Sequence, residues 1–181
     1  MGALTSTGPV SIEEYLTNPA YRHYEYIEGK PIQLHVGTKD HSRIQVKCSR
    51  KLDEYFDCHP GGYVAAELHC RLKIRGEVRF RLPDIAVVLG PDTSPDSRYL
   101  DRAPDLVVEI RSPDDTVGAQ LRKFDEYFEN GTKMAWLILP EERSVIVAEP
   151  GKAARTVITG ETLDAGHLLP DLRIPVHGLF A

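Results

Sequence analysis

The pattern of apolar runs constrains the fold of this chain more than any other feature of its sequence. Residues 106–110 and 134–139 are almost continuously apolar, which is typical of strands buried on both faces of a sheet. Between them, residues 117–130 carry apolar side chains at helical spacing and end at Gly131. A strand, a helix and a second strand in this order predict a crossover within an α/β domain.

The other segments predict antiparallel strands and two more helices. Helices are expected at 11–16 and 40–56, a hairpin at 24–34, a long hairpin at 63–75 and 77–89, late strands at 145–148 and 156–158, a loop at 90–103 and a tail at 168–180. The fold class is therefore α/β, with a central mixed sheet flanked by helices. A length of 181 residues fits one domain over 11–181, after a flexible start at 1–10.

Composition excludes several classes of protein. No run approaches the ~18 apolar residues of a membrane helix, and the first residues lack a secretory signal. Cys48, Cys58 and Cys70 show no CxxC spacing, so free thiols in a reducing cytoplasm are expected. The chain has no GxSxG, HExxH, P-loop or GxGxxG motif. A net charge of −5 does not favour nucleic acid unless positive charge is concentrated locally.

Two carboxylates mark the ends of neighbouring apolar runs. Asp84 opens the run 82–89 and Glu109 closes the run 104–110. Strands lie about 4.8 Å apart, so carboxylates at matching levels can share a divalent metal. An acid directly after a buried apolar run is costly unless something pairs with it, although both residues can also simply lie at the surface. Asp105 lies about 13 Å from Glu109 on the same strand, which is too far to chelate one ion with it.

Three further residues can complete a site. Lys123 lies at the border of a helical apolar stripe, where it can reach a reacting phosphate or remain a solvated lysine. His41 is expected to face inward, as a ligand, base or orienting donor or as an ordinary core histidine. Glu25 alternates with two tyrosines, which also suits a surface acid. Together with the carboxylates, these residues are the minimal equipment of a metal-dependent phosphodiesterase.

Positive charge is concentrated on the long hairpin. Its basic residues alternate with apolar ones, so one face of the hairpin is expected to be apolar and the other basic. The residues proposed for nucleic-acid binding are Arg71, Lys73, Arg79 and Arg81. On an acidic protein such a strip indicates a surface for a phosphate backbone. A solvated sheet face, partly neutralised by Glu67 and Glu77, explains the pattern as well.

Taken together, these motifs resemble the Uma-type family of restriction endonucleases, within the PD-(D/E)XK nuclease superfamily. The matching segments are 24–30, the helix opening with His41, 82–85, 104–113, 123–127, Gly131 with Trp136, and 169–172. The resemblance covers nearly the whole chain after residue 10. It implies a restriction-endonuclease-like core and a Mg²⁺ or Mn²⁺ site at Asp84 and Glu109.

The sequence departs from the superfamily's E-x-K motif, because Arg111 occupies the lysine position. Lys123 matches the place of the lysine in this branch, and His41 and Glu25 match positions that the branch often keeps near the site. The resemblance therefore implies a catalytic set made of Asp84, Glu109, Lys123, His41 and Glu25.

The resulting expectation is a metal-dependent endonuclease that cleaves DNA. A nuclease-like binding or accessory module without catalysis is the alternative, for which the acidic net charge and Arg111 leave room. A hydrolase of small phosphate esters is a third reading. A homodimer would supply two active sites for cutting both strands, but no residue requires it.

Overall fold

A six-stranded mixed sheet forms the centre of the computed structural model, which describes residues 8–34 and 37–180. The strand order is β10-β9-β8-β7-β6-β3. Their bounds are β3 Gly62–Ala66, β6 Ile85–Leu89, β7 Leu106–Ile110, β8 Met134–Leu139, β9 Ser144–Ala148 and β10 Arg155–Ile158. Only β7 and β8 pair in parallel among these strands, and α3 (Val117–Glu129) joins them. The predicted crossover and mixed sheet are confirmed.

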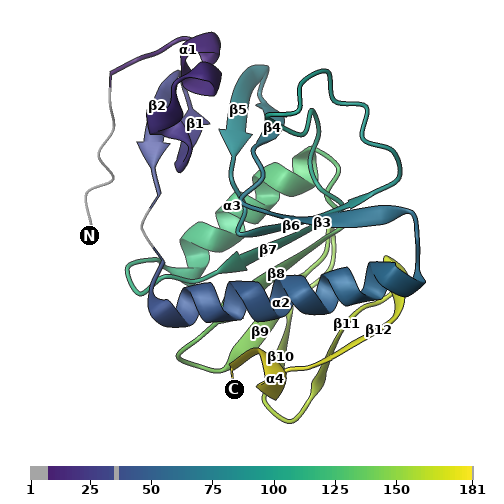
Figure 1. Cartoon of the computed structure of the whole chain (residues 1–181). Coiled ribbons are helices and arrows are strands. Elements are labelled where there is room, and N and C mark those ends of the chain that lie inside the picture. Colours follow the sequence, from purple (N-terminus) through teal and green to yellow (C-terminus); the bar gives the residue numbers. More distant parts are fainter. Residues whose placement is uncertain (1–7, 35–36, 181) are drawn as a thin grey trace.

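Two helices cover opposite faces of this sheet (Figure 1). Helix α2 (Lys39–Cys58) buries Ile44, Cys48 and Leu52 against one face. Helix α3 buries Phe124 and Tyr127 against the other. Because both faces are covered, the central strands have almost no polar side chains, which is why their runs are so apolar. The described part of the chain contains no helix long and apolar enough to cross a membrane.

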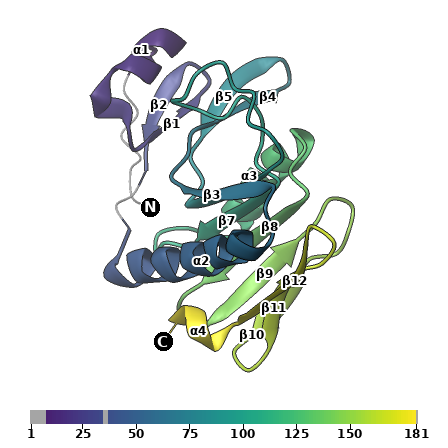
Figure 2. The same cartoon turned by 45° about the vertical axis from the view of Figure 1, so that its right-hand side comes forward.

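A second sheet lies beside the first, with the strand order β2-β1-β5-β4. Its strands are β1 Tyr24–Ile27, β2 Lys30–Gln33, β4 Cys70–Ile74 and β5 Glu77–Arg81. Helix α1 (Ile12–Thr17) and a short 3₁₀ helix, η1 (Pro19–Tyr21), complete this part. Tyr15, Tyr26 and Phe80 form its small core. Figure 2 shows this unit at the top of the view, above β3 and α2.

The long hairpin predicted around Gly76 is divided between the two sheets, which corrects that expectation. Strands β4 and β5 pair around Gly76 in the second sheet, while β3 and β6 continue the same register in the central sheet. Between the two ladders, the Glu67 amide donates to the Asp84 carbonyl at 3.3 Å. The break occurs because Pro83 has no amide hydrogen to donate and Glu67 adopts a left-handed φ of 49°.

The end of the chain is more regular than expected. The predicted tail at 168–180 contains strand β12 (Leu169–Pro175) and helix α4 (His177–Phe180), and β12 pairs with β11 (Thr162–Ala165). Leu172 and Ile174 are buried, so period-two burial outweighs the two prolines of this segment. At the other end of the chain, residues 1–7 of the expected flexible start lie outside the described residues.

Candidate active site

Asp84 and Glu109 come together through the register of two central strands. Ile85 of β6 lies opposite Val108 of β7 in an antiparallel pair. One step further along, Asp84 therefore lies opposite Glu109, and directly opposed residues point their side chains to the same face. The structure thus brings together the two carboxylates that the sequence singled out, at the sheet edge where β7 ends near the beginning of α2 (Figure 1).

Both carboxylate oxygens of Asp84 and its backbone carbonyl have polar contacts. Its Oδ2 accepts the amide hydrogen of Ile110 at 2.6 Å, and its Oδ1 lies 3.2 Å from Nε2 of His41. Its carbonyl accepts the Glu67 amide and, at 2.9 Å, the side-chain amide of Gln45 on α2. Helix α2 therefore contributes two side chains that position this residue.

Lys123 connects Glu109 to Glu25. Its ammonium nitrogen lies 2.8 Å from Oε1 of Glu109 and 2.8 Å from Oε1 of Glu25. The Tyr127 hydroxyl, one turn further along α3, lies 3.5 Å from the same Glu109 oxygen. Both of these contacts use Oε1 of Glu109, and neither uses Oε2. The lysine at the border of the helical stripe thus reaches into the acidic pair, and Glu25 is buried beside it.

Two arginines of the predicted basic strip are turned inward. Arg81 pairs with Glu25 and, at 2.8 Å, with Glu126 of α3. Arg79 pairs with Glu126 at 2.6 Å and with Glu28 at 3.1 Å. The side chain of Arg79 is only 15% exposed and that of Arg81 only 11%. Their charges therefore pair with acidic groups inside the protein.

The other half of the strip is more open. Arg71 is partly exposed and pairs with Asp101 at 2.9 Å, while Lys73 is exposed. The alternation itself holds on β4, where Cys70, Leu72 and Ile74 are buried. Nucleic-acid binding by the four basic residues therefore stays a prediction, and the geometry gives Arg79 and Arg81 a structural task.

The electrostatics of the site are strongly perturbed. Burial acts to raise the pKa of Glu25, but Lys123 and Arg81 outweigh it and lower that pKa to about 2. Burial raises the pKa of Glu109 to about 8, with Lys123 opposing this effect and Asp84 adding to it. Glu25 is thus held ionised, whereas burial and the neighbouring Asp84 disfavour the ionised form of Glu109.

Neighbouring carboxylates raise the pKa of both His41 and Lys123. Burial acts to lower the pKa of His41, but the bond to Asp84 and its charge outweigh burial and raise it. For Lys123, burial lowers the pKa, and the charges of Glu109 and Glu25 more than reverse that effect. Both cations therefore sit against carboxylates that they help to hold in place.

The donor set fits a divalent metal of the Mg²⁺ type. Within residues 8–34 and 37–180, no three His, Cys, Asp or Glu side chains are grouped so that they alone could hold a metal. Mg²⁺ does not need such a cage, because it commonly uses one or two carboxylates together with substrate phosphates and water. The opposed carboxylates supply oxygen ligands, and a bound cation would offset the repulsion between them that helps to raise the pKa of Glu109.

Gly37 is a site residue that the sequence analysis missed. A Cβ at this position would lie 2.6 Å from Nδ1 of His41, closer than real side chains allow. Glycine therefore lets the histidine ring pack against the backbone just before α2. A lone glycine next to a helix start gives no sequence signal for this role. Thr38, which caps α2 by accepting the His41 amide at 3.2 Å, is the signal that was available.

Arg111 points away from the acidic pair. Its guanidinium donates at 3.0 Å to both Glu141 and Glu142, in the turn between β8 and β9. The position of the superfamily lysine is therefore occupied by a residue engaged elsewhere. The cation at Glu109 comes from α3 instead.

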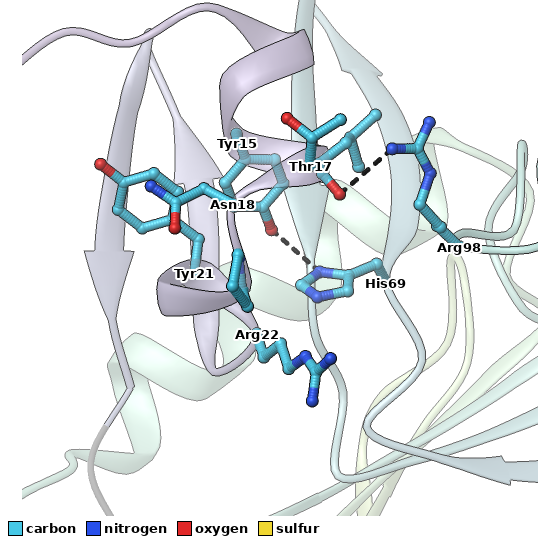
Figure 3. A pocket seen from close by; sticks show the side chains of 9 residues that line it. Tyr15, Thr17, Asn18, Tyr21, Arg22, His69 and Arg98 are labelled. Carbon is cyan, nitrogen blue, oxygen red and sulfur yellow. Dashed lines mark hydrogen bonds between the residues drawn. The ribbon is translucent and has the colours of Figure 1, made fainter.

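A cavity of about 410 Å³ lies apart from these residues, between α1 and the second sheet (Figure 3). Tyr15, Tyr21, Arg22, His69 and Arg98 contribute to its walls. The Tyr15 hydroxyl lies 2.9 Å from Nδ1 of His69. No member of the carboxylate and lysine cluster lines it. The candidate site is thus defined by converging charged side chains and not by this cavity.

Comparisons with known proteins identify the family and the fold. A family model named Uma2 and described as "Putative restriction endonuclease" matches residues 12–177. The crystal structure of a protein from Anabaena variabilis, described as a putative nuclease belonging to DUF820, superposes with a TM-score of 0.80. The two chains are 26% identical, and the match covers 95% of this chain and 98% of the other. No curated protein matches the sequence.

Proposed function

Because this chain belongs to the Uma2 family, whose description is that of restriction endonucleases, we propose that it is a metal-dependent endonuclease acting on DNA. The observation that carries this proposal is the meeting of Asp84, Glu109 and Lys123 at one sheet edge. Asp84 directly precedes β6, Glu109 lies on β7 and Lys123 comes from α3, so the three side chains converge from separate segments of the chain. Their convergence supports phosphodiester hydrolysis, since that reaction needs a bound cation and a positive charge near the phosphate.

The carboxylates would hold the metal, and the other residues would hold the carboxylates. Asp84 and Glu109 offer oxygen ligands suited to Mg²⁺ or Mn²⁺. When bound, such an ion neutralises phosphate charge and lowers the pKa of a water molecule. His41 fixes the orientation of Asp84 through Oδ1, while the Ile110 amide fixes Oδ2.

Lys123 would act on the substrate from a preorganised position. Its ammonium group is placed by Glu25 as well as by Glu109, and Glu25 is itself fixed by Arg81 and by the Leu82 amide at 3.2 Å. A cation held in this way can stabilise negative charge on the phosphate without rearranging during the reaction. Glu25 and Arg81 are in this proposal positioning residues.

The substrate would approach over the outward-facing side chains of β4, the end strand of the second sheet. Arg71 and Lys73 remain available there for backbone phosphates. Cleavage of both strands would be served by a homodimer with two sites.

The decisive experiment is nicking of supercoiled plasmid with Mg²⁺, with Mn²⁺ and with a chelator. We expect nicking only with metal, loss of nicking in Asp84→Ala, and wild-type nicking in Asp164→Ala. The control removes a carboxylate on β11 that pairs with Arg155, outside the site. Undiminished cleavage by Asp84→Ala would refute the assignment. Plasmid binding without cleavage under any condition would instead identify an accessory module.

A further inference from the structure

A second cavity, of about 220 Å³, lies on the flank of α2. Its walls come from α2, from the turn between β8 and β9, and from α4 at the end of the chain. Figures 1 and 2 show α4 lying alongside α2, close to the point where the described chain ends. The charged residues around it are Asp40, Arg43, Lys47 and Arg143. Three cations and one carboxylate make this cavity electropositive on a chain whose net charge is −5.

The cavity and the carboxylate site open at the same edge of the central sheet. Strands β7 and β8 are parallel, so both end there, β7 beside Asp84 and β8 just before Pro140 of the cavity wall. Helix α2 separates the two places, with His41 toward Asp84 and Lys47 toward the cavity. The width of a helix with its side chains is about 10–12 Å. One nucleic-acid strand, rising about 3.4 Å per nucleotide, spans that distance in a few nucleotides.

Two of the cations, Lys47 and Arg143, have no acidic partner among the described residues, and one of them is positioned by an aromatic ring. The Arg143 guanidinium lies 5.5 Å from the ring centroid of Phe180, a cation–π contact that orients the group while keeping its charge. In the described part of the chain, neither Lys47 nor Arg143 has a carboxylate within ion-pair distance. Arg79 and Arg81, by contrast, have their charge matched internally by Glu126 and other acids.

We propose that this cavity binds a backbone phosphate of the nucleic acid a few nucleotides away from the bond that is cleaved. This inference rests on the proposed nuclease function. An arginine fork next to a lysine point charge suits a phosphate group, and the cavity is large enough to admit one while α2 keeps it apart from the metal carboxylates. The cavity would fix the direction in which the nucleic-acid strand crosses the carboxylates, and it would take no part in the chemical step.

The first test measures binding without cleavage. Fluorescence anisotropy with a labelled duplex in a chelator compares wild type, the double variant Lys47→Gln/Arg143→Gln, and the control Lys152→Gln/Arg155→Gln. The control removes two cations that pair with Glu149 and Asp164, away from the cavity. We expect the first variant to bind about 10-fold more weakly, and the slope of log K against log salt to fall by about one phosphate contact. The control should bind as wild type does.

The second test locates the phosphate. Duplexes with a single uncharged methylphosphonate linkage are placed in turn on each side of the cleavage position. In wild type, a methylphosphonate at one position a few nucleotides from the cleaved bond should weaken binding. In the double variant, a methylphosphonate at that same position should cause no additional loss of binding. Lys47→Arg, which keeps the charge, should retain wild-type binding and guards against a folding artefact.

The outcomes separate this inference from the function itself. If wild type cleaves DNA with metal but the double variant binds like the control, the phosphate site is refuted and the nuclease stands. If a methylphosphonate penalty appears equally in wild type and double variant, the site is also refuted. If wild type neither binds nor cleaves, the proposed function fails and the phosphate site fails with it.

Discussion

Asp84 and Asp105 begin in the same way and end with different tasks. Each follows a proline and precedes one of the two neighbouring antiparallel strands, β6 and β7, so the two lie at opposite ends of that pair. Each accepts the amide hydrogen of the last residue of the other strand. Ile110 donates to Asp84 at 2.6 Å and Leu89 donates to Asp105 at 2.8 Å. The motif therefore closes the end of a strand ladder wherever it occurs.

The difference lies in what approaches from outside the motif. Asp105 pairs with Lys133 at 2.7 Å and with Arg102 at 3.0 Å. Burial acts to raise its pKa, but Lys133 and the other hydrogen bonds outweigh burial and lower it. Asp84 meets His41 on one side and a second carboxylate, Glu109, on the other. At the Asp105 end, two basic side chains pair with a single carboxylate, which suits a structural role. At the Asp84 end, two carboxylates lie close together, and a bound cation would offset their repulsion.

Removing the charge at each end is the largest test of this comparison. Asparagine keeps an acceptor for the strand-end amide, so only the carboxylate charge is lost. Asp84→Asn should reduce cleavage by about 10³-fold, with little change in the free energy of unfolding. Asp105→Asn should leave cleavage intact and lower the free energy of unfolding by about 1.5–3 kcal/mol. Plasmid nicking rates and urea unfolding measure both, and a reversed pattern would refute the assignment of tasks.

The lysines at the two ends sharpen the same comparison. Lys123 is buried between Glu109 and Glu25, while Lys133 is 62% exposed and pairs only at one side of Asp105. Lys123→Met should lower cleavage by about 10²-fold and destabilise the protein by about 3 kcal/mol, since it leaves buried carboxylates unpaired. Lys133→Met should cost under about 1 kcal/mol and no activity. Equal stability losses would show that burial of the site lysine has no energetic consequence.

The sequence was sufficient to predict the central strands because burial on both faces leaves an unmistakable apolar run. Residues 134–139 form β8 with the predicted bounds, and 106–110 form β7. The division of the long hairpin was missed, because the same alternation continues through both halves. Pro83 marks the break, yet a proline at that point is equally typical of a single edge strand.

The carboxylates of the site were within reach of sequence reasoning, and their supporting ion pairs were not. Adjacent strands predict that Asp84 and Glu109 can meet, and a stripe border predicts that Lys123 can reach inward. Arg81 looked like a surface residue because alternation gives the face of a strand but not what covers it. Glu126, on a helix far along the chain, covers that face and pairs with it.

The stability of the protein is expected to fall in acid through carboxylates at both ends of the β6–β7 pair. Near the candidate site the group responsible is Glu25, whose folded pKa of about 2 lies below its ordinary value of 4.5. The ionised form is favoured by folding, so its contribution is complete above pH 4.5 and is lost as pH falls toward 2. At the other end the lowered pKa of Asp105 acts in the same direction.

Glu25→Gln should therefore flatten the loss of stability between about pH 5 and about pH 2 and remove up to about 3 kcal/mol of the stability at neutral pH. Urea unfolding across that range measures the slope. Asp105→Asn provides the comparison and should flatten the slope too. An unchanged slope in Glu25→Gln would mean that the carboxylate is not held ionised by Lys123 and Arg81.

The histidine is the feature that only the Asp84 end possesses, and Gly37 tests it most gently. Gly37→Ala places a methyl group 2.6 Å from Nδ1 of His41, so the ring whose Nε2 contacts Asp84 must be displaced. A displaced positioning group of this kind should lower cleavage by about 10-fold with little change in stability. Gly118→Ala is the matched control, because its Cβ would meet Arg122 at an ordinary 3.5 Å. Full activity in Gly37→Ala, with the ring shift verified by the histidine NMR signals, would show that His41 does not position Asp84 for the reaction.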